Sequence, residues 1–89
     1  MAQRTVTIAS AVGLHARPAA LFVRAASETG LDIGIGRLGE EAVDATSILA
    51  VMALGAGHGE EVVVTAEGDG ADAALDVLVA LLSRDLDAG

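Results

Sequence analysis

Gly13-Leu14-His15-Ala16-Arg17-Pro18-Ala19 is the stretch that decides how this chain is organised, because a strand-like run ends there and a helix-like run begins. It contains the only proline of the chain. Proline is favoured in the first turn of a helix, where its missing N–H has no intrahelical acceptor. We therefore predict a helix from about Ala16 to Ser27, with His15 at or next to its N-cap.

The start of this predicted helix has the properties of an anion site. The free N–H groups of a first helical turn and the positive end of the helix dipole both favour a bound phosphate. The same dipole disfavours imidazolium, so the His15 ring is expected to stay neutral and nucleophilic near neutral pH. Arg17 could counter the charge of a phosphoryl group on that ring. The residues alone also fit a plainer interpretation, in which His15 is a surface residue that caps a helix and Arg17 is solvated.

The hydrophobic pattern predicts the order strand, helix, strand, strand, helix, strand, helix. We expect strands over about residues 4–9, 31–36, 41–45 and 61–66, and further helices ending near Leu54 and Leu86. Four strands with helices on one face make a two-layer α+β fold. The predicted core consists of the apolar residues on the inward stripes, namely Val6, Ile8, Phe22, Ile33, Val62, Val64, Leu75, Leu78 and Leu82.

Length and composition limit the classes of protein to which this chain can belong. The 89 residues predict one domain spanning residues 1–89. The formal net charge is −8, and all five basic residues are arginines, so binding to nucleic acid or to an anionic membrane is not expected. There is no cysteine, and no apolar run approaches the roughly 20 residues of a membrane-spanning helix. We expect a cytoplasmic protein without membrane insertion.

Residues 13–19 resemble, position by position, the active loop of the histidine-containing phosphocarrier (HPr) family of the bacterial phosphoenolpyruvate-dependent sugar phosphotransferase system. A second stretch, Ser47-Ile48-Leu49-Ala50-Val51-Met52-Ala53-Leu54-Gly55, is similar to that family's second helix. The resemblance covers essentially the whole chain. It implies an open-faced antiparallel sheet of βαββαβα order, with three helices on one side.

The resemblance also implies an activity. His15 would accept a phosphoryl group on Nδ1 from Enzyme I and pass it to a histidine of a sugar-permease EIIA domain. Arg17 would balance the phosphoryl charge, and Ala16 and Pro18 would support the loop. The chain would be a carrier and not an enzyme, and it would act as a monomer without a cofactor or a metal.

Ser47 is expected to cap the second helix, a role that Thr46 could also fill. The resemblance adds regulatory phosphorylation of Ser47 by a serine kinase, and a transcriptional regulator as another possible partner. It further implies an apolar docking patch beside His15, with contributions from Ala20, Arg24, Ile48, Leu49 and Met52. Relatives often carry lysines around this surface, where the present chain has Ser27, Thr46 and Ala50.

Other interpretations remain open from the sequence. A paralogue of the same fold could serve a nitrogen-related or dihydroxyacetone-related relay, with the same chemistry and different partners. A regulatory binding module that never carries phosphate is a second alternative, which the presence of His15 disfavours. His58 lies in a glycine-rich loop without a recognisable motif and is expected to be a surface residue.

Overall fold

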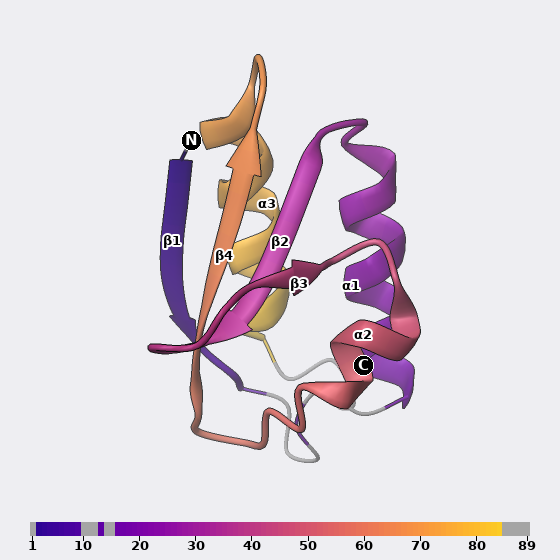
Figure 1. The fold of residues 1–89 in the computed structure, drawn as a ribbon, viewed down its shortest axis with the longest axis vertical. Coiled ribbons are helices and arrows are strands. Elements are labelled where there is room, and N and C mark those ends of the chain that lie inside the picture. The colour runs from indigo at the N-terminus through magenta and orange to yellow at the C-terminus, as the bar shows by residue number, and fades with distance from the viewer. Residues whose placement is uncertain (1, 10–12, 14–15, 85–89) are drawn as a thin grey trace.

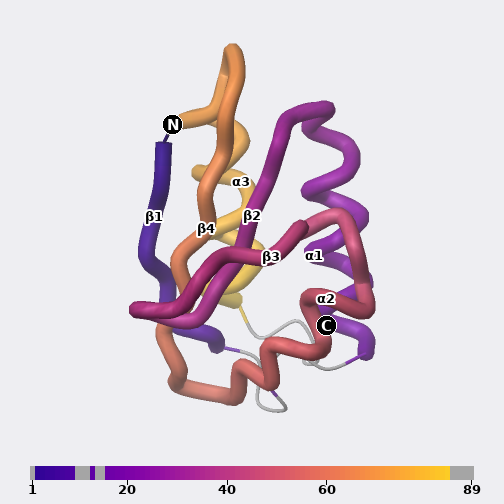
Figure 2. Tube along the Cα trace, in the orientation of Figure 1, coloured from indigo at the N-terminus to yellow at the C-terminus, as the bar shows by residue number. Residues whose placement is uncertain are grey.

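The computed structural model describes residues 2–9, 13 and 16–84, and its elements follow the predicted order. They are β1 (Ala2–Thr7), α1 (Ala16–Glu28), β2 (Asp32–Arg37), β3 (Val43–Asp44), α2 (Ile48–Ala53), β4 (Glu61–Glu67) and α3 (Ala71–Leu82). The four strands form one sheet in the order β1-β4-β2-β3, and every neighbouring pair is antiparallel. The predicted α+β fold class is therefore confirmed (Figures 1 and 2).

The register of the sheet explains the core. Val6 lies opposite Val62, and Ile35 lies opposite Val64, so that the apolar residues of neighbouring strands point to the same side. Helices α1 and α3 cover that side and bury their own apolar stripes against it (Figure 1). All nine predicted core residues are buried, and Phe22, the only aromatic residue, is fully enclosed.

The outer face of β2 carries two alternating glycines, Gly34 and Gly36, and residues 41–43 lie directly over them. A Cβ on Gly36 would lie 2.9 Å from the carbonyl oxygen of Glu41, so glycine is needed there for a close backbone approach. A Cβ on Gly34 would lie 2.7 Å from Oγ1 of Thr65 and 3.3 Å from Cβ of Ala42, so the space beside this glycine is filled by side chains. Because the chain crosses the strand in this way, β3 pairs over only two residues, Val43 and Asp44.

The last helix is shorter than predicted within the described part of the chain. It ends at Leu82, and the hydroxyl of the following Ser83 donates to the carbonyl oxygen of Ala80 at 3.1 Å. The N–H of Arg84 then donates to the carbonyl of Leu81, three residues back, as in a tightened final turn. The predicted end at Leu86 lies outside the described residues.

Candidate functional site

The N-terminus of α1 lies where the sequence predicted it. The helix begins at Ala16, and Pro18 occupies its first turn with a buried ring. Ala16 and Arg17 are exposed, and the first turn contains no acidic residue that would offset the positive end of the dipole. This end of the helix is therefore suited to an anion. His15, the predicted phosphoryl acceptor, lies outside the described residues.

The chain approaches α1 through Gly13, which is buried against another part of the backbone. Its φ of +74° lies in the left-handed region that L-residues rarely adopt. A Cβ at this position would lie 2.6 Å from the carbonyl oxygen of Ala56 and 2.8 Å from Cα of Gly57. The segment after α2 therefore forms the surface against which Gly13 rests.

The exposed side of α1 carries a stripe at helical spacing. Arg17, Ala20, Leu21 and Arg24 are all exposed and follow the i, i+3, i+4, i+7 pattern of one helix face. The exposure of Ala20 and Arg24 agrees with the predicted docking role. Leu21, which is 38% exposed, was missed by the sequence reasoning. Its spacing from Arg17 and Arg24 would have placed it on this face.

Helix α2 is started by Ser47, as predicted. The side chain of Ser47 occupies the N-cap position and accepts a hydrogen bond from the N–H of Ala50 at 3.3 Å. Thr46 has a different role, because its N–H and its hydroxyl both donate to Oδ1 of Asp44, at 2.9 and 2.7 Å. Both bonds favour the ionised carboxylate and hold the pKa of Asp44 below its usual value, and the bond from the Thr46 hydroxyl has the larger effect. Asp44 and Thr46 thus form the turn that presents Ser47.

Helix α2 packs beside α1 and leaves part of its apolar surface uncovered. Val51 is buried and Met52 is half-buried, whereas Ile48 and Leu49 are 38% and 79% exposed. We use the term docking patch for seven residues on neighbouring faces of the two helices: Arg17, Ala20, Leu21, Arg24, Ile48, Leu49 and Met52. An apolar surface with a charged rim suits a transient protein contact.

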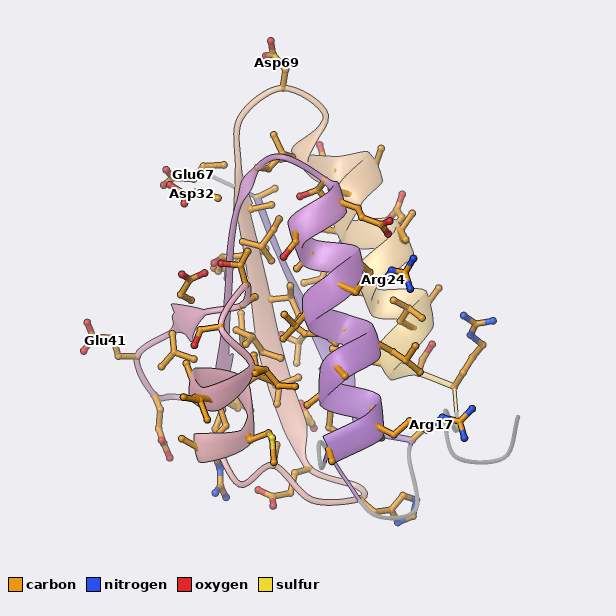
Figure 3. The ribbon with its side chains drawn as sticks, turned by 90° about the vertical axis from the view of Figure 1, so that its right-hand side faces the viewer. Arg17, Arg24, Asp32, Glu41, Glu67 and Asp69 are labelled. Atoms are coloured by element: carbon orange, nitrogen blue, oxygen red, sulfur yellow. The ribbon has the colours of Figure 1, made fainter. Side chains whose placement is uncertain are left out.

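Charge is distributed unevenly over the molecule. Figure 3 shows Arg17 and Arg24 on one side, and Asp32, Glu41 and Glu67 on the other. Arg24 also lies 3.9 Å from the carboxylate of Glu28, a contact that moderates its charge. Ser27 and Thr46 are exposed and Ala50 is half-buried, so none of these three neighbouring positions adds a basic side chain. The docking patch is therefore only weakly basic.

Three further observations concern other kinds of site. His58 is exposed in a turn, as predicted for a surface residue. Among the described residues, no cluster of three or more histidine or acidic side chains has the arrangement of a metal site. None of the helices in the described part of the chain is long and apolar enough to cross a membrane.

Fold and site together define a small open-faced α+β protein that presents the exposed, positively polarised end of α1 beside a weakly basic apolar patch. Residues 2–84 match the family model described as "PTS HPr component phosphorylation site". The chain therefore belongs to the HPr family, the phosphocarrier proteins of the phosphotransferase system.

Individual relatives agree with this assignment. The chain is 47% identical over 87 residues to a phosphocarrier protein HPr of Streptomyces coelicolor, covering 98% of this chain and 94% of the relative. It is 51% identical to one of Haloferax volcanii, covering 91% and 92% of the two chains. A crystal structure of HPr from Thermoanaerobacter tengcongensis matches with a TM-score of 0.85 at 41% identity, covering 92% of this chain and 91% of that one.

Two other similar proteins carry different descriptions. A phosphocarrier protein NPr of Shewanella violacea is 39% identical over 85 residues, 96% of this chain and 92% of the relative. A crystal structure described as an HPr dimer from Thermoanaerobacter tengcongensis matches with a TM-score of 0.68 at 42% identity, covering 91% and 92% of the two chains.

Proposed function

We propose that this chain is a cytoplasmic phosphocarrier, formed as one domain over residues 1–89, that accepts a phosphoryl group from phospho-Enzyme I on His15. It then passes the group to a histidine of a sugar-permease EIIA domain. The observation that carries this proposal is the exposed N-terminus of α1, with Arg17 in its first turn, directly after His15 in a chain of the HPr family. A carrier of this kind is not itself an enzyme and uses no cofactor.

The proposed transfer needs no co-reactant. The lone pair of Nδ1 of His15 forms a bond to phosphorus, while the electron pair of the breaking donor–phosphorus bond returns to the donor. The phosphorylated ring carries negative charge, which the α1 dipole and the Arg17 guanidinium both stabilise. The same groups then favour retention of the phosphoryl group until a second protein supplies a competing acceptor.

The docking patch is the proposed contact surface for both partners. It runs from Arg17 in the first turn of α1 along that helix and onto α2, which packs beside it, and Leu49 has the largest exposed fraction of its apolar side chains. With only Arg17 and Arg24 as cations on the patch, association is expected to depend more on apolar burial than on charge steering. We propose that the chain acts as a monomer, since one exposed copy of this patch is sufficient for each transfer.

Ser47 is the proposed regulatory position. A phosphate there would lie at the N-terminus of α2, which favours negative charge, so that the helix should remain formed. It would also place charge next to Ile48 and Leu49 in the docking patch. A serine kinase is the proposed modifying partner, and a transcriptional regulator is a further proposed partner.

A second partner set is supported by the similarity to the protein described as NPr. In that case the chemistry at His15 is unchanged, and the donor and acceptor belong to a nitrogen-related relay. Parallel phosphorylation assays with Enzyme I of each relay separate the two possibilities.

The decisive experiment is labelling with radioactive phosphoenolpyruvate and Enzyme I. The wild-type chain should acquire one label that is stable in alkali and lost in acid, as expected for phosphohistidine and not for phosphoserine. His15→Ala should abolish the label without unfolding the chain, and the matched variant His58→Ala should be labelled normally. Acid-labile label that persists in His15→Ala would refute the assignment.

A further inference from the structure

We propose that Glu60 and Arg37 are positioning residues for the phosphoryl-accepting loop, acting through the turn at residues 55–60 and through Gly13. This inference rests on the proposed function of His15. Neither residue belongs to the active loop or to the docking patch, and nothing in the sequence motifs singles them out.

The first link is the contact between Gly13 and the turn at residues 55–60. A Cβ added to Gly13 would lie 2.6 Å from the carbonyl oxygen of Ala56 and 2.8 Å from Cα of Gly57. The two backbones are therefore as close as a glycine allows. Gly13 is two residues before His15. A displacement of the turn would therefore be transmitted to the backbone that leads into α1.

The second link is the way in which this turn is held. Gly55, Gly57 and Gly59 make up half of it and have no side chains to pack into the core. A segment of this composition needs hydrogen bonds to keep one conformation. The N–H of Gly59 donates to the carbonyl of Ile8 at 2.9 Å, and the N–H of Ile8 donates to the carbonyl of Glu60 at 2.9 Å, so the far end is attached to the chain after β1.

The Glu60 carboxylate holds the near end, because it connects the turn to the sheet. Its Oε1 accepts a hydrogen bond from the N–H of Gly57 at 2.9 Å, and its Oε2 pairs with Nη2 of Arg37 at the end of β2. Nη1 of the same guanidinium lies 3.5 Å from the carbonyl oxygen of Leu54, at the end of α2. One side-chain pair therefore joins the end of β2, the end of α2 and the residue on which Gly13 rests.

The ion pair itself is only half-buried, with 39% of the Arg37 side chain and 36% of the Glu60 side chain exposed. Such a pair contributes little to global stability because solvent screens it. Its effect is expected in geometry, since phosphoryl transfer is sensitive to small displacements of the accepting group.

Two variants and a matched control test it. Glu60→Ala removes the bond to Gly57 and the pair with Arg37, whereas Glu60→Gln keeps an oxygen that can accept from Gly57. Arg4→Ala is the control, because Arg4 forms a comparable surface ion pair with Asp72 at 3.2 Å, between β1 and α3. Circular dichroism should report the native fold for all three.

The expected kinetic result is a loss of rate without a loss of docking. At saturating phospho-Enzyme I, Glu60→Ala should be phosphorylated on His15 about three- to tenfold more slowly than wild type, with an unchanged half-saturating concentration. Glu60→Gln should recover part of the rate, because its single side-chain oxygen can accept from Gly57 while the ion pair with Arg37 is lost. Arg4→Ala should match wild type. A rate equal to that of the control, a changed half-saturating concentration alone, or no recovery with glutamine would each overturn the proposal.

An NMR measurement separates this proposal from the proposed function. In Glu60→Ala the amide signals of Gly13 and Gly57 should shift, and the Gly57 amide should exchange faster with solvent, while Arg4→Ala leaves both signals in place. This measurement needs no phosphoryl donor. If wild type is not phosphorylated at all, the proposed function is wrong. Unchanged Gly13 signals in Glu60→Ala would refute the positioning role, whatever the result of the phosphorylation assay.

Discussion

Replacing Gly13 with alanine is the perturbation whose cost can best be worked out from the structure. Two penalties add at this position. A residue with a Cβ at a φ of +74° incurs about 1–2 kcal/mol for the left-handed conformation. The same Cβ would lie 2.6 Å from the Ala56 carbonyl oxygen and 2.8 Å from Cα of Gly57, and forcing it into that packed backbone costs about 1–3 kcal/mol more.

Gly39→Ala provides the matched control. Gly39 has a φ of +84°, and a Cβ there would meet no atom within 4 Å. This variant therefore incurs only the conformational penalty, partly offset by about 0.4–1 kcal/mol because alanine restricts the unfolded chain. Gly13→Ala should consequently be less stable than Gly39→Ala by about 1–3 kcal/mol.

Urea unfolding followed by circular dichroism measures the difference. A domain of this size has a total stability of about 5–15 kcal/mol, so both variants should remain folded. The midpoint should fall further for Gly13→Ala, with the same dependence on urea in both variants. Equal midpoints would show that the contact between Gly13 and residues 56–57 does not constrain the loop, and would remove the basis for coupling this turn to His15.

Four further predictions concern the site and its surroundings. Arg17→Ala should fold normally but transfer the phosphoryl group about ten- to a hundredfold more slowly, because one charge-assisted contact is lost. Leu49→Asp should weaken binding to Enzyme I about tenfold by titration calorimetry, whereas Val77→Asp, at an exposed position on α3, should not. Ser47→Asp should slow phosphorylation of His15 without lowering the melting temperature, since aspartate also caps helices. In wild type the ionised Asp44 carboxylate should stabilise the fold above about pH 4, the usual pKa of an aspartate, and this stabilisation should be lost as the pH falls through the lowered pKa of Asp44. Asp44→Asn should lack this contribution.

Each of these has an outcome that contradicts it. Wild-type transfer rates in Arg17→Ala or in Ser47→Asp would remove the proposed roles of those residues. Equal loss of affinity in Leu49→Asp and Val77→Asp would mean that the docking patch is not the contact surface. For Asp44→Asn, urea midpoints measured from acid to neutral pH that follow the wild-type curve would show that the contacts from Thr46 do not stabilise the fold.

Local patterns in the sequence were sufficient for the elements and the core. Proline in a first turn predicted the start of α1 at Ala16, and a serine before an apolar run predicted the cap of α2 at Ser47. The alternation of Val62 and Val64 predicted a half-buried strand, which is found as β4. These features depend on interactions between residues a few positions apart, which is why the order of residues alone predicts them.

Contacts between segments that are far apart in the sequence could be identified only from the tertiary structure. The sequence did not indicate that residues 41–43 cross the glycines of β2, because that approach depends on the path of the chain between two strands. Nor did it relate Gly13 to Ala56, or Arg37 to Glu60, which are 43 and 23 positions apart in the chain. Hydrogen bonds and close backbone contacts of this kind exist only after the hydrophobic core has set the relative positions of the strands and helices, and a single sequence contains no periodic signal for them.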